Sequence, residues 1–211
     1  WMKNSTIELE RVNMIAIIGA MDEEVNALLQ LMEDVRVESI GKVKFYHGTL
    51  NSKELVLFKS GIGLSIAAMS TSICLSHYSI DGVVNIGTAG GLKDNQNVLD
   101  IVVSDKITYH DFDISPFGNT RDFSSNNRFV FHSDESYIQK FNQLNKDERV
   151  WIAPLVSGNQ FIYNDKQIND ITHNFPEALA VEMEGASIAH VCSEFNVPFI
   201  VIRSISDLNT S

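Results

Sequence analysis

Apolar and polar residues near the start of the chain first follow a strand pattern and then a helix pattern. A short apolar run, Met14–Ile18, ends at Gly19 and predicts a buried strand. A helix that begins near Asp22 is predicted next, because apolar residues then recur at helical spacing. These residues are Val25, Leu28, Leu29 and Met32.

The next part of the chain predicts a hairpin, a helix and a second buried strand. The pair Asn51-Ser52 separates two strand-like segments and is typical of a tight turn. The predicted elements are strands at Lys42–Leu50 and Glu54–Lys59, a helix from the Ser60–Gly63 turn to about Tyr78, and a strand at Gly82–Ile86 that closes on Gly87–Gly91.

The second half continues the alternation of strands and helices. Strands are predicted at Asp100–Ser104, Arg149–Val156 and Pro198–Ile202, and helices at Lys166–Asn174 and Glu184–Phe195. The segment Tyr109–Asp134 has no clear period, and because loops this long are usually functional or mobile, we expect it to form a lid, an interface or both. Strands that alternate with helices indicate an α/β fold with a mostly parallel central sheet.

Length and composition fit one globular domain. The chain has 211 residues, of which 44% are hydrophobic and 20% charged, and can bury a substantial core. We interpret residues 1–13 as an N-terminal extension and residues 14–211 as the domain. The chain ends in polar residues after its last predicted strand, so we expect the domain to lack a closing C-terminal helix.

Charge and cysteine content argue against several classes of partner. The 27 acidic residues outnumber the 16 Lys and Arg residues, and no basic cluster suits nucleic acid or an anionic membrane. Cys74 and Cys192 show no ligand or redox spacing, so we expect reduced thiols in a cytoplasmic protein. No apolar run reaches the roughly 18 to 20 residues of a membrane helix, and the first residues lack a signal peptide's apolar stretch.

Three predicted strand ends run into sequences that can form one site. These sequences are Gly19–Glu24, Gly87–Gly91 and Arg203–Asp207. Ligands of open α/β sheets bind at the carboxyl ends of strands, so we expect the three segments to converge on a pocket. The glycines would let backbone amides approach a ligand, although such turns are also common for packing reasons.

The acidic residues at these ends have structural as well as catalytic interpretations. Asp22 and Glu23 fit first-turn acids favoured by the helix dipole, whereas Glu24 can point toward the strand end. Glu182 and Glu184 lie one residue apart at a strand-to-helix transition. One of them should therefore face the sheet end while the other is solvated or caps the helix.

Motifs for other kinds of catalytic group are absent from the sequence, so the carboxylates are the best candidates for catalytic residues. For Asp207, just past a predicted strand end, helix capping and catalysis are comparable interpretations. The histidines show no metal-ligand spacing, and His110–Asp113 is too short a cluster to bind a metal by itself. The chain has no GxSxG elbow, no P-loop and no GxGxxG turn, which argues against serine hydrolases, P-loop enzymes and dinucleotide-binding enzymes.

Six segments, taken together and in order, resemble the methylthioadenosine/S-adenosylhomocysteine nucleosidase family. They are Ile17–Val25, Ser60–Gly63, Gly87–Gly91, His173–Pro176, Ala180–Glu184 and Arg203–Asp207. The resemblance implies a single-domain nucleoside-phosphorylase-like fold, with three α/β/α layers around a mixed, mostly parallel sheet, in a homodimer. It also implies hydrolysis of 5'-methylthioadenosine, S-adenosylhomocysteine and 5'-deoxyadenosine to adenine and a 5'-substituted ribose, as in methionine salvage, with no cofactor or metal.

The resemblance assigns the two reacting groups by position. Asp207 matches the general acid that protonates adenine N7, and Glu24 matches the base that orients the attacking water. Adenine is a poor leaving group until it is protonated, and the ribosyl carbon develops oxocarbenium character. A general acid on the adenine side makes adenine a better leaving group. A carboxylate that holds water on the opposite side stabilises the positive charge on the ribosyl carbon.

Further positions match residues that bind the substrate. Glu184 matches the carboxylate that accepts the ribose 2'- and 3'-hydroxyls, Met183 packs under the sugar, and Arg203 positions the acidic cluster. Phe161 and Ile162 match the segment that stacks on adenine and reads its edge.

The remaining matches surround the ribose, the 5'-group and the dimer contact. Ser206 is expected to support Asp207 by a hydrogen bond. By position, Met21 and Thr88 line the water and ribose side, Ile62 contacts the 5'-alkylthio group, and Ile114 and Phe117 reach into the neighbouring subunit's pocket.

Three positions depart from the family pattern without removing a reacting group. Thr88 stands where serine is common, and Ser204 stands where alanine is common. Gly158–Phe161, with Asn159 at its second position, replaces the more usual Gly-Asp-x-Phe. The C-terminal helix expected to be missing is the one that packs over the pocket in the family.

Two alternative functions stay open. A purine nucleoside phosphorylase has the same fold, but it needs cations for phosphate where this chain has the acidic run Asp22–Glu24 and Asn85. A non-catalytic nucleoside-binding protein would keep the apolar lining and lose an acid or the base, whereas this chain retains all three. These three residues are Glu24, Glu184 and Asp207.

Overall fold

The computed structural model describes residues 14–144 and 149–208, so the predicted extension at residues 1–13 lies outside the described residues. The strands are β1 (Ile15–Gly19), β2 (Glu33–Ile40), β3 (Val43–Leu50), β4 (Lys53–Lys59), β5 (Gly82–Gly91), β6 (Ile101–Tyr109), β7 (Phe131–His132), β8 (Val150–Ser157), β9 (Ala180–Glu182) and β10 (Phe199–Leu208). The helices are α1 (Asp22–Leu29), α2 (Leu64–His77), the 3-10 turn η1 (Ser115–Phe117), α3 (Glu135–Leu144), α4 (Asp165–Asn174) and α5 (Gly185–Glu194).

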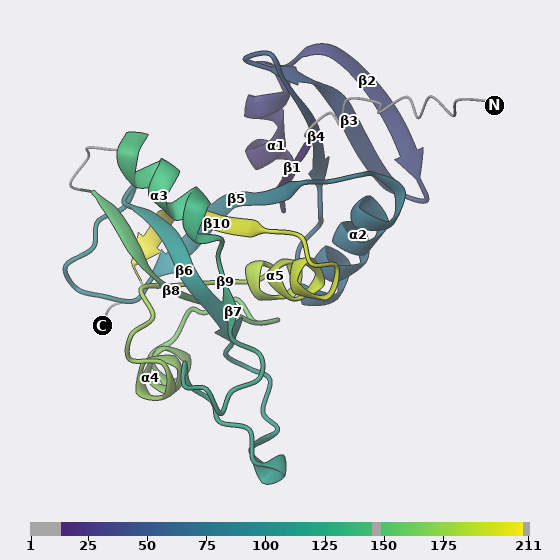
Figure 1. The fold of residues 1–211 in the computed structure, drawn as a ribbon. Helices are drawn as coiled ribbons and strands as arrows, with labels where there is room; N and C mark the ends of the chain where they lie inside the picture. The colour runs from purple at the N-terminus through teal and green to yellow at the C-terminus, as the bar shows by residue number, and fades with distance from the viewer. Residues whose placement is uncertain (1–13, 145–148, 209–211) are drawn as a thin grey trace.

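A mixed sheet holds the strands together, with helices packed around it (Figure 1). β5 pairs in parallel with β1 on one side and with β10 on the other, and β1 also pairs in parallel with β4. β10 in turn pairs antiparallel with β6, β6 pairs in parallel with β8, and β9 connects β8 to β5. Strands β5, β10, β6, β8 and β9 therefore form a closed ring, which the hairpin strands β4, β3 and β2 extend beyond β1. The predicted α/β fold is confirmed.

The main core lies between the sheet and helices α2 and α5, which pack against each other (Figure 1). Cys74 of α2 and Cys192 of α5 are both buried and both free. Burial raises the pKa of both thiols, that of Cys74 to about 12, so they stay protonated at neutral pH. None of the described helices has the length and apolar character that a membrane span requires.

The hairpin between β3 and β4 turns where the sequence predicts it. Asn51 and Ser52 both have positive φ angles, 49° and 61°. Two consecutive residues of this kind are typical of a type I′ turn, whose twist matches that of the flanking strands.

Two strands continue further than the sequence predicted. The prediction that Gly87–Gly91 closes β5 as a turn was wrong, because these glycines pair with β10 and, at Gly90 and Gly91, with β9. β10 likewise runs through Arg203 to Leu208, with an irregular register between Ile205 and Asp207. Asp207 therefore lies within a strand, and the interpretation of it as a helix cap was wrong.

Strand β2 and helix α3 were missed although Val35 and Val37 alternate with polar residues in β2 and Tyr137, Ile138 and Phe141 recur at helical spacing in α3. All but one of the residues of β2 are exposed, and helix α3 contains no buried residue. Met32, predicted on the face of the first helix, lies beyond the end of α1. The long segment between β6 and β7 is largely irregular and projects from the body of the fold, with η1 at its tip (Figure 1).

Candidate active site

A cavity of about 390 Å³ lies where the strand ends of the sheet come together. Its walls come from residues in or just after β1, β4, β5, β8, β9 and β10. The predicted site residues that line it are Met21, Glu24, Ile62, Thr88, Phe161, Ile162, Met183, Glu184, Ser206 and Asp207. The three predicted segments therefore do converge on one pocket.

Three predicted residues do not line this cavity. Arg203 is buried behind it, and Ile114 and Phe117 lie on the projecting segment, where Phe117 is 83% exposed. The cavity is also lined by residues that were not predicted to contact the ligand, namely Ala20, Ala89, Gly90, Gln160, Val181 and Glu182. All of them lie inside segments already singled out in the sequence, and their place in those segments is the signal that could have identified them.

Glu24 is held in the first turn of α1 with its carboxylate against the end of β5. The carboxylate accepts the backbone N–H groups of Ala20 at 2.6 Å, Met21 at 3.1 Å and Thr88 at 3.1 Å. A Cβ atom on Gly87 would lie 2.8 Å from Glu24 Oε1 and would displace the carboxylate, so the glycine keeps the carboxylate in its present position. Glu24 thus caps its helix and also presents a fixed carboxylate to the cavity.

Glu184 is a buried carboxyl group at the start of α5. It is 7% exposed, and its Oε1 accepts the N–H of Gly63 at 2.8 Å. Burial, followed by the negative charge of Glu182, raises the pKa of Glu184 to about 7. This carboxyl group therefore changes its charge near neutral pH.

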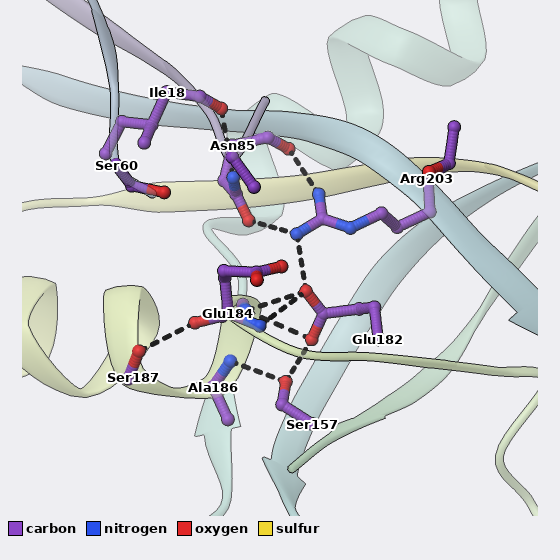
Figure 2. A network of polar contacts seen from close by, with 12 residues as sticks. Ile18, Ser60, Asn85, Ser157, Glu182, Glu184, Ala186, Ser187 and Arg203 are labelled. Atoms are coloured by element: carbon purple, nitrogen blue, oxygen red, sulfur yellow. Dashed lines mark hydrogen bonds and ion pairs between the residues drawn. The ribbon is translucent and has the colours of Figure 1, made fainter. Parts of the chain in front are cut away.

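Glu182, which lines the cavity, forms an ion pair with Arg203 behind it, shown in Figure 2. The two side chains are 2.7 Å apart and each is only 2% exposed. Burial alone would raise the pKa of Glu182, but the guanidinium of Arg203 and the hydroxyl of Ser157 outweigh it and keep that pKa below its usual range. Glu182 also accepts the Gly185 N–H at 2.8 Å, and Arg203 donates to Asn85 Oδ1 at 2.5 Å. Neither glutamate is solvated, so that interpretation of the second acid was wrong, whereas the capping alternative fits Glu182, which accepts amides at the start of α5.

Ser206 and Asp207 face the cavity together because of an irregularity in β10. Successive side chains of a regular strand point to opposite faces, but the register of β10 shifts between Ile205 and Asp207. As a result both residues line the cavity. Ser206 Oγ donates to Asp207 Oδ1 at 2.6 Å, which is the hydrogen bond that the sequence analysis expected.

An aromatic and an aliphatic side chain follow β8 on another wall. Ile162 is buried and packs with Phe175, whereas the ring of Phe161 is exposed beside the cavity. An exposed ring of this kind offers its face to a flat heterocycle. Gln160, just before it, lines the same wall.

The cavity combines acids with apolar surface. Within residues 14–144 and 149–208, no lysine, arginine or histidine lines it, and no group of acids, histidines and cysteines is arranged to hold a metal ion. Such a lining suits a neutral ligand with hydroxyl groups and an apolar part, and its carboxyl groups can transfer protons.

Comparisons with known proteins point to one family. A family model described as the phosphorylase superfamily matches residues 14–211. A 5'-methylthioadenosine/S-adenosylhomocysteine nucleosidase from Staphylococcus aureus (strain JH9) is 40% identical over 197 residues, which are 92% of this chain and 86% of that protein.

Two solved structures are also similar. The nucleosidase of the same name from Neisseria meningitidis, in complex with methylthio-immucillin-A, has a TM-score of 0.87 and 35% identity over 92% of this chain and 86% of that one. The nucleosidase from Colwellia psychrerythraea, in complex with adenine, has a TM-score of 0.87 and 34% identity over 94% of this chain and 84% of that one.

The buried ion pair should dominate the stability of the site. Arg203→Met leaves the Glu182 carboxylate buried without its partner, so we expect the free energy of unfolding to fall by about 3–5 kcal/mol. Urea unfolding measures this change. Lys59→Met is the matched control, because Lys59 pairs with Asp22 at 2.8 Å on the surface and its loss should cost less than about 1 kcal/mol.

The double variant Glu182→Gln/Arg203→Met removes both charges and should recover part of the lost stability. An equal fall in the free energy of unfolding in Arg203→Met and Lys59→Met would show that the buried ion pair stabilises the protein no more than the surface pair.

Proposed function

Because this chain belongs to the phosphorylase superfamily and, within it, to the methylthioadenosine/S-adenosylhomocysteine nucleosidases, we propose that it hydrolyses the N-glycosidic bond of these two nucleosides. The products are adenine and the 5'-substituted ribose. The observation that carries the proposal is the set of carboxyl groups that different elements bring to one cavity, with Asp207 on β10 and Glu24 on α1.

Asp207 is the proposed general acid on the adenine side. It lines the same cavity as Phe161 and Ile162, the proposed adenine-binding residues. Protonation of the purine converts a poor leaving group into a neutral one, which lowers the barrier to bond cleavage. The hydroxyl of Ser206, 2.6 Å from Asp207 Oδ1, fixes the direction of the carboxyl group.

Glu24 is the proposed base that orients the attacking water. Its carboxylate is fixed by three backbone N–H groups, so little reorganisation is needed when charge develops at the ribosyl carbon. Met21 and Thr88, beside it, form the proposed water and ribose side.

The charge of the cavity favours water over phosphate as the nucleophile. Glu24 and Glu184 line it, the charge of Glu182 is balanced by Arg203, and in the described part of the chain no basic side chain lines it. A phosphate anion would be repelled in this partly desolvated site, whereas a water molecule would not. Hydrolysis is therefore favoured over phosphorolysis.

Glu184 is the proposed ligand of the ribose hydroxyls, with Met183 beneath the sugar and Ile62 near the 5'-group. Glu184 is buried and already accepts one backbone N–H, so it is well placed to accept further hydrogen bonds when charged. Arg203 acts indirectly, by neutralising Glu182 next to it.

The proposed assembly is a homodimer in which Ile114 and Phe117 reach the partner's cavity. Both lie on the segment that projects from the fold, and neither lines the cavity of its own chain. The strong exposure of the Phe117 ring supports a role in contact with another subunit.

Adenine release in the presence and absence of phosphate tests the reaction. We expect this chain to release adenine from methylthioadenosine at the same rate with and without phosphate, because water is the nucleophile. Chromatography of adenine measures the release. Release that requires phosphate would identify a phosphorylase, and no release despite nucleoside binding would identify a binding protein.

Asp207→Asn should abolish turnover while leaving nucleoside binding largely intact. Asparagine has the same size but cannot supply the acid proton, so we expect kcat to fall by about 10²–10⁴-fold. Initial rates and calorimetric binding of methylthioadenosine separate the two effects. Asp22→Asn, at an exposed acid that pairs with Lys59, is the control and should be fully active. Normal turnover by Asp207→Asn would refute the assigned acid.

The pH dependence of substrate binding should follow Glu184. Its pKa is raised to about 7, so the carboxyl group is neutral below that pH and charged above it. Because the charged form accepts the ribose hydroxyls better, KM for methylthioadenosine should fall as the pH rises through about 7. Glu182, Arg203 and Glu24 are the charged groups around it. Glu184→Gln should remove this step in KM, whereas the control Glu23→Gln should keep it.

A further inference from the structure

Asn159 connects two walls of the cavity that are far apart in the sequence. It follows β8, two residues before Phe161, and its side-chain Oδ1 accepts the N–H of Leu64 at 3.0 Å. Leu64 is the first residue of α2. The preceding amide, that of Gly63, donates to Glu184 at 2.8 Å. Two neighbouring amides of this turn are thus each held by a side chain from a different wall.

The backbone around Asn159 is anchored as well. The Asn159 N–H donates to Asp111 Oδ2 at 2.7 Å. Gly158 lies directly on the ring of His110, which is buried, and any Cβ at this glycine would clash with that ring. Asp111 and His110 both follow β6, at the start of the projecting segment. Asn159 is therefore fixed on one side and reaches across to α2 on the other.

We propose that Asn159 is a positioning residue whose hydrogen bond to Leu64, named the clasp here, sets the width of the cavity between Ile62 and Phe161. The proposal rests on the proposed function for the identity of the ligand. Ile62 and Phe161 both line the cavity, and each lies two residues from one end of the clasp. Asn159 itself does not line the cavity, so it acts through these walls.

The width matters only to a ligand that touches both walls. A nucleoside with a 5'-alkylthio group contacts Ile62 with that group and Phe161 with its base, whereas free adenine contacts only the wall of Phe161. Loss of the clasp should therefore weaken binding of the longer ligand selectively. A general loss of folding would weaken both ligands together.

The variants follow from the chemistry of the acceptor. Asn159→Ala removes the acceptor oxygen, whereas Asn159→Asp keeps one in the same place, as in the Gly-Asp-x-Phe pattern more usual in the family. Asn164→Ala is the matched control. Asn164 follows the same wall, and its Oδ1 accepts the Gln167 N–H at 3.1 Å as the cap of α4, without reaching another wall of the cavity.

Calorimetry with methylthio-immucillin-A and with adenine tests the clasp. For Asn159→Ala we expect Kd for methylthio-immucillin-A to rise about five-fold, equivalent to about 1 kcal/mol, and Kd for adenine to change by less than about two-fold. Asn159→Asp should bind both ligands as the unaltered chain does, and so should Asn164→Ala. In turnover assays, KM for methylthioadenosine should rise in Asn159→Ala while kcat stays the same.

Several results would overturn the clasp. They are equal weakening of both ligands by Asn159→Ala, no weakening of either, an equal effect of Asn164→Ala, or no rescue by Asn159→Asp. Failure of the proposed function has a different signature, since the unaltered chain would then bind methylthio-immucillin-A but release adenine from methylthioadenosine only with phosphate or not at all. The calorimetric comparison of variants would still decide the clasp in that case.

Asp111→Ala provides a second, independent variant. It removes the acceptor of the Asn159 N–H, so it should also raise Kd for methylthio-immucillin-A more than Kd for adenine. Asp111 and Asn159 act on the same hydrogen-bonded link between the walls. The double variant should therefore lose less binding free energy for methylthio-immucillin-A than the sum of the two single losses. Full additivity would show that Asp111 and Asn159 act independently and would overturn the anchoring part of the proposal.

Discussion

The buried ion pair of Glu182 and Arg203 is the interaction on which the rest of the site depends. Two charges removed from water are costly unless each finds a partner of good geometry and further hydrogen bonds. Here the carboxylate also accepts amides at the start of α5, and the guanidinium also binds Asn85 on β5. Asn85 in turn donates to the carbonyl of Ile18 on β1 at 3.0 Å. One pair of charges thus connects β1, β5, β9, β10 and α5.

The buried ion pair also gives the neighbouring acids different charge states. Glu182 has a guanidinium against it and stays charged, whereas Glu184, buried beside that negative charge, holds its proton up to neutral pH. Glu24 is different again, because backbone amides rather than a cation hold it. Three carboxyl groups can share one small cavity because each has its own kind of partner.

Much of the fold was predictable because its buried strands and its turn residues leave strong local patterns. The apolar run of β1, the start of the strand after α2 and the turn at Asn51-Ser52 were each placed within a few residues. The strand β2 was not predicted, because its alternation of Val35 and Val37 with polar residues is short and both valines stay exposed at the sheet edge. The closed ring was also beyond prediction, because strand order depends on contacts between distant segments.

The site likewise combines residues that a local sequence pattern reveals with contacts that depend on the folded structure. Glu24, Glu184 and Asp207 were found because each lies at a strand end in a family motif, and the structure brings them to one cavity. The partner of Arg203 was left open, since the spacing of Glu182 and Glu184 does not say which of the two faces a guanidinium. Asn159 stood out only as a departure from a motif, and its link to Leu64 became visible only in three dimensions.

The position of β10 in the closed ring has a consequence for how the site comes into being during folding. β10 lies between β5 and β6, yet it follows both of them by a long stretch of chain. Closing so long a loop costs chain entropy, which the contacts of β10 with both neighbouring strands must compensate. Until that strand docks, the chain has neither Asp207 in place nor a cation against Glu182. The ability to break a glycosidic bond therefore requires the closure of the ring itself.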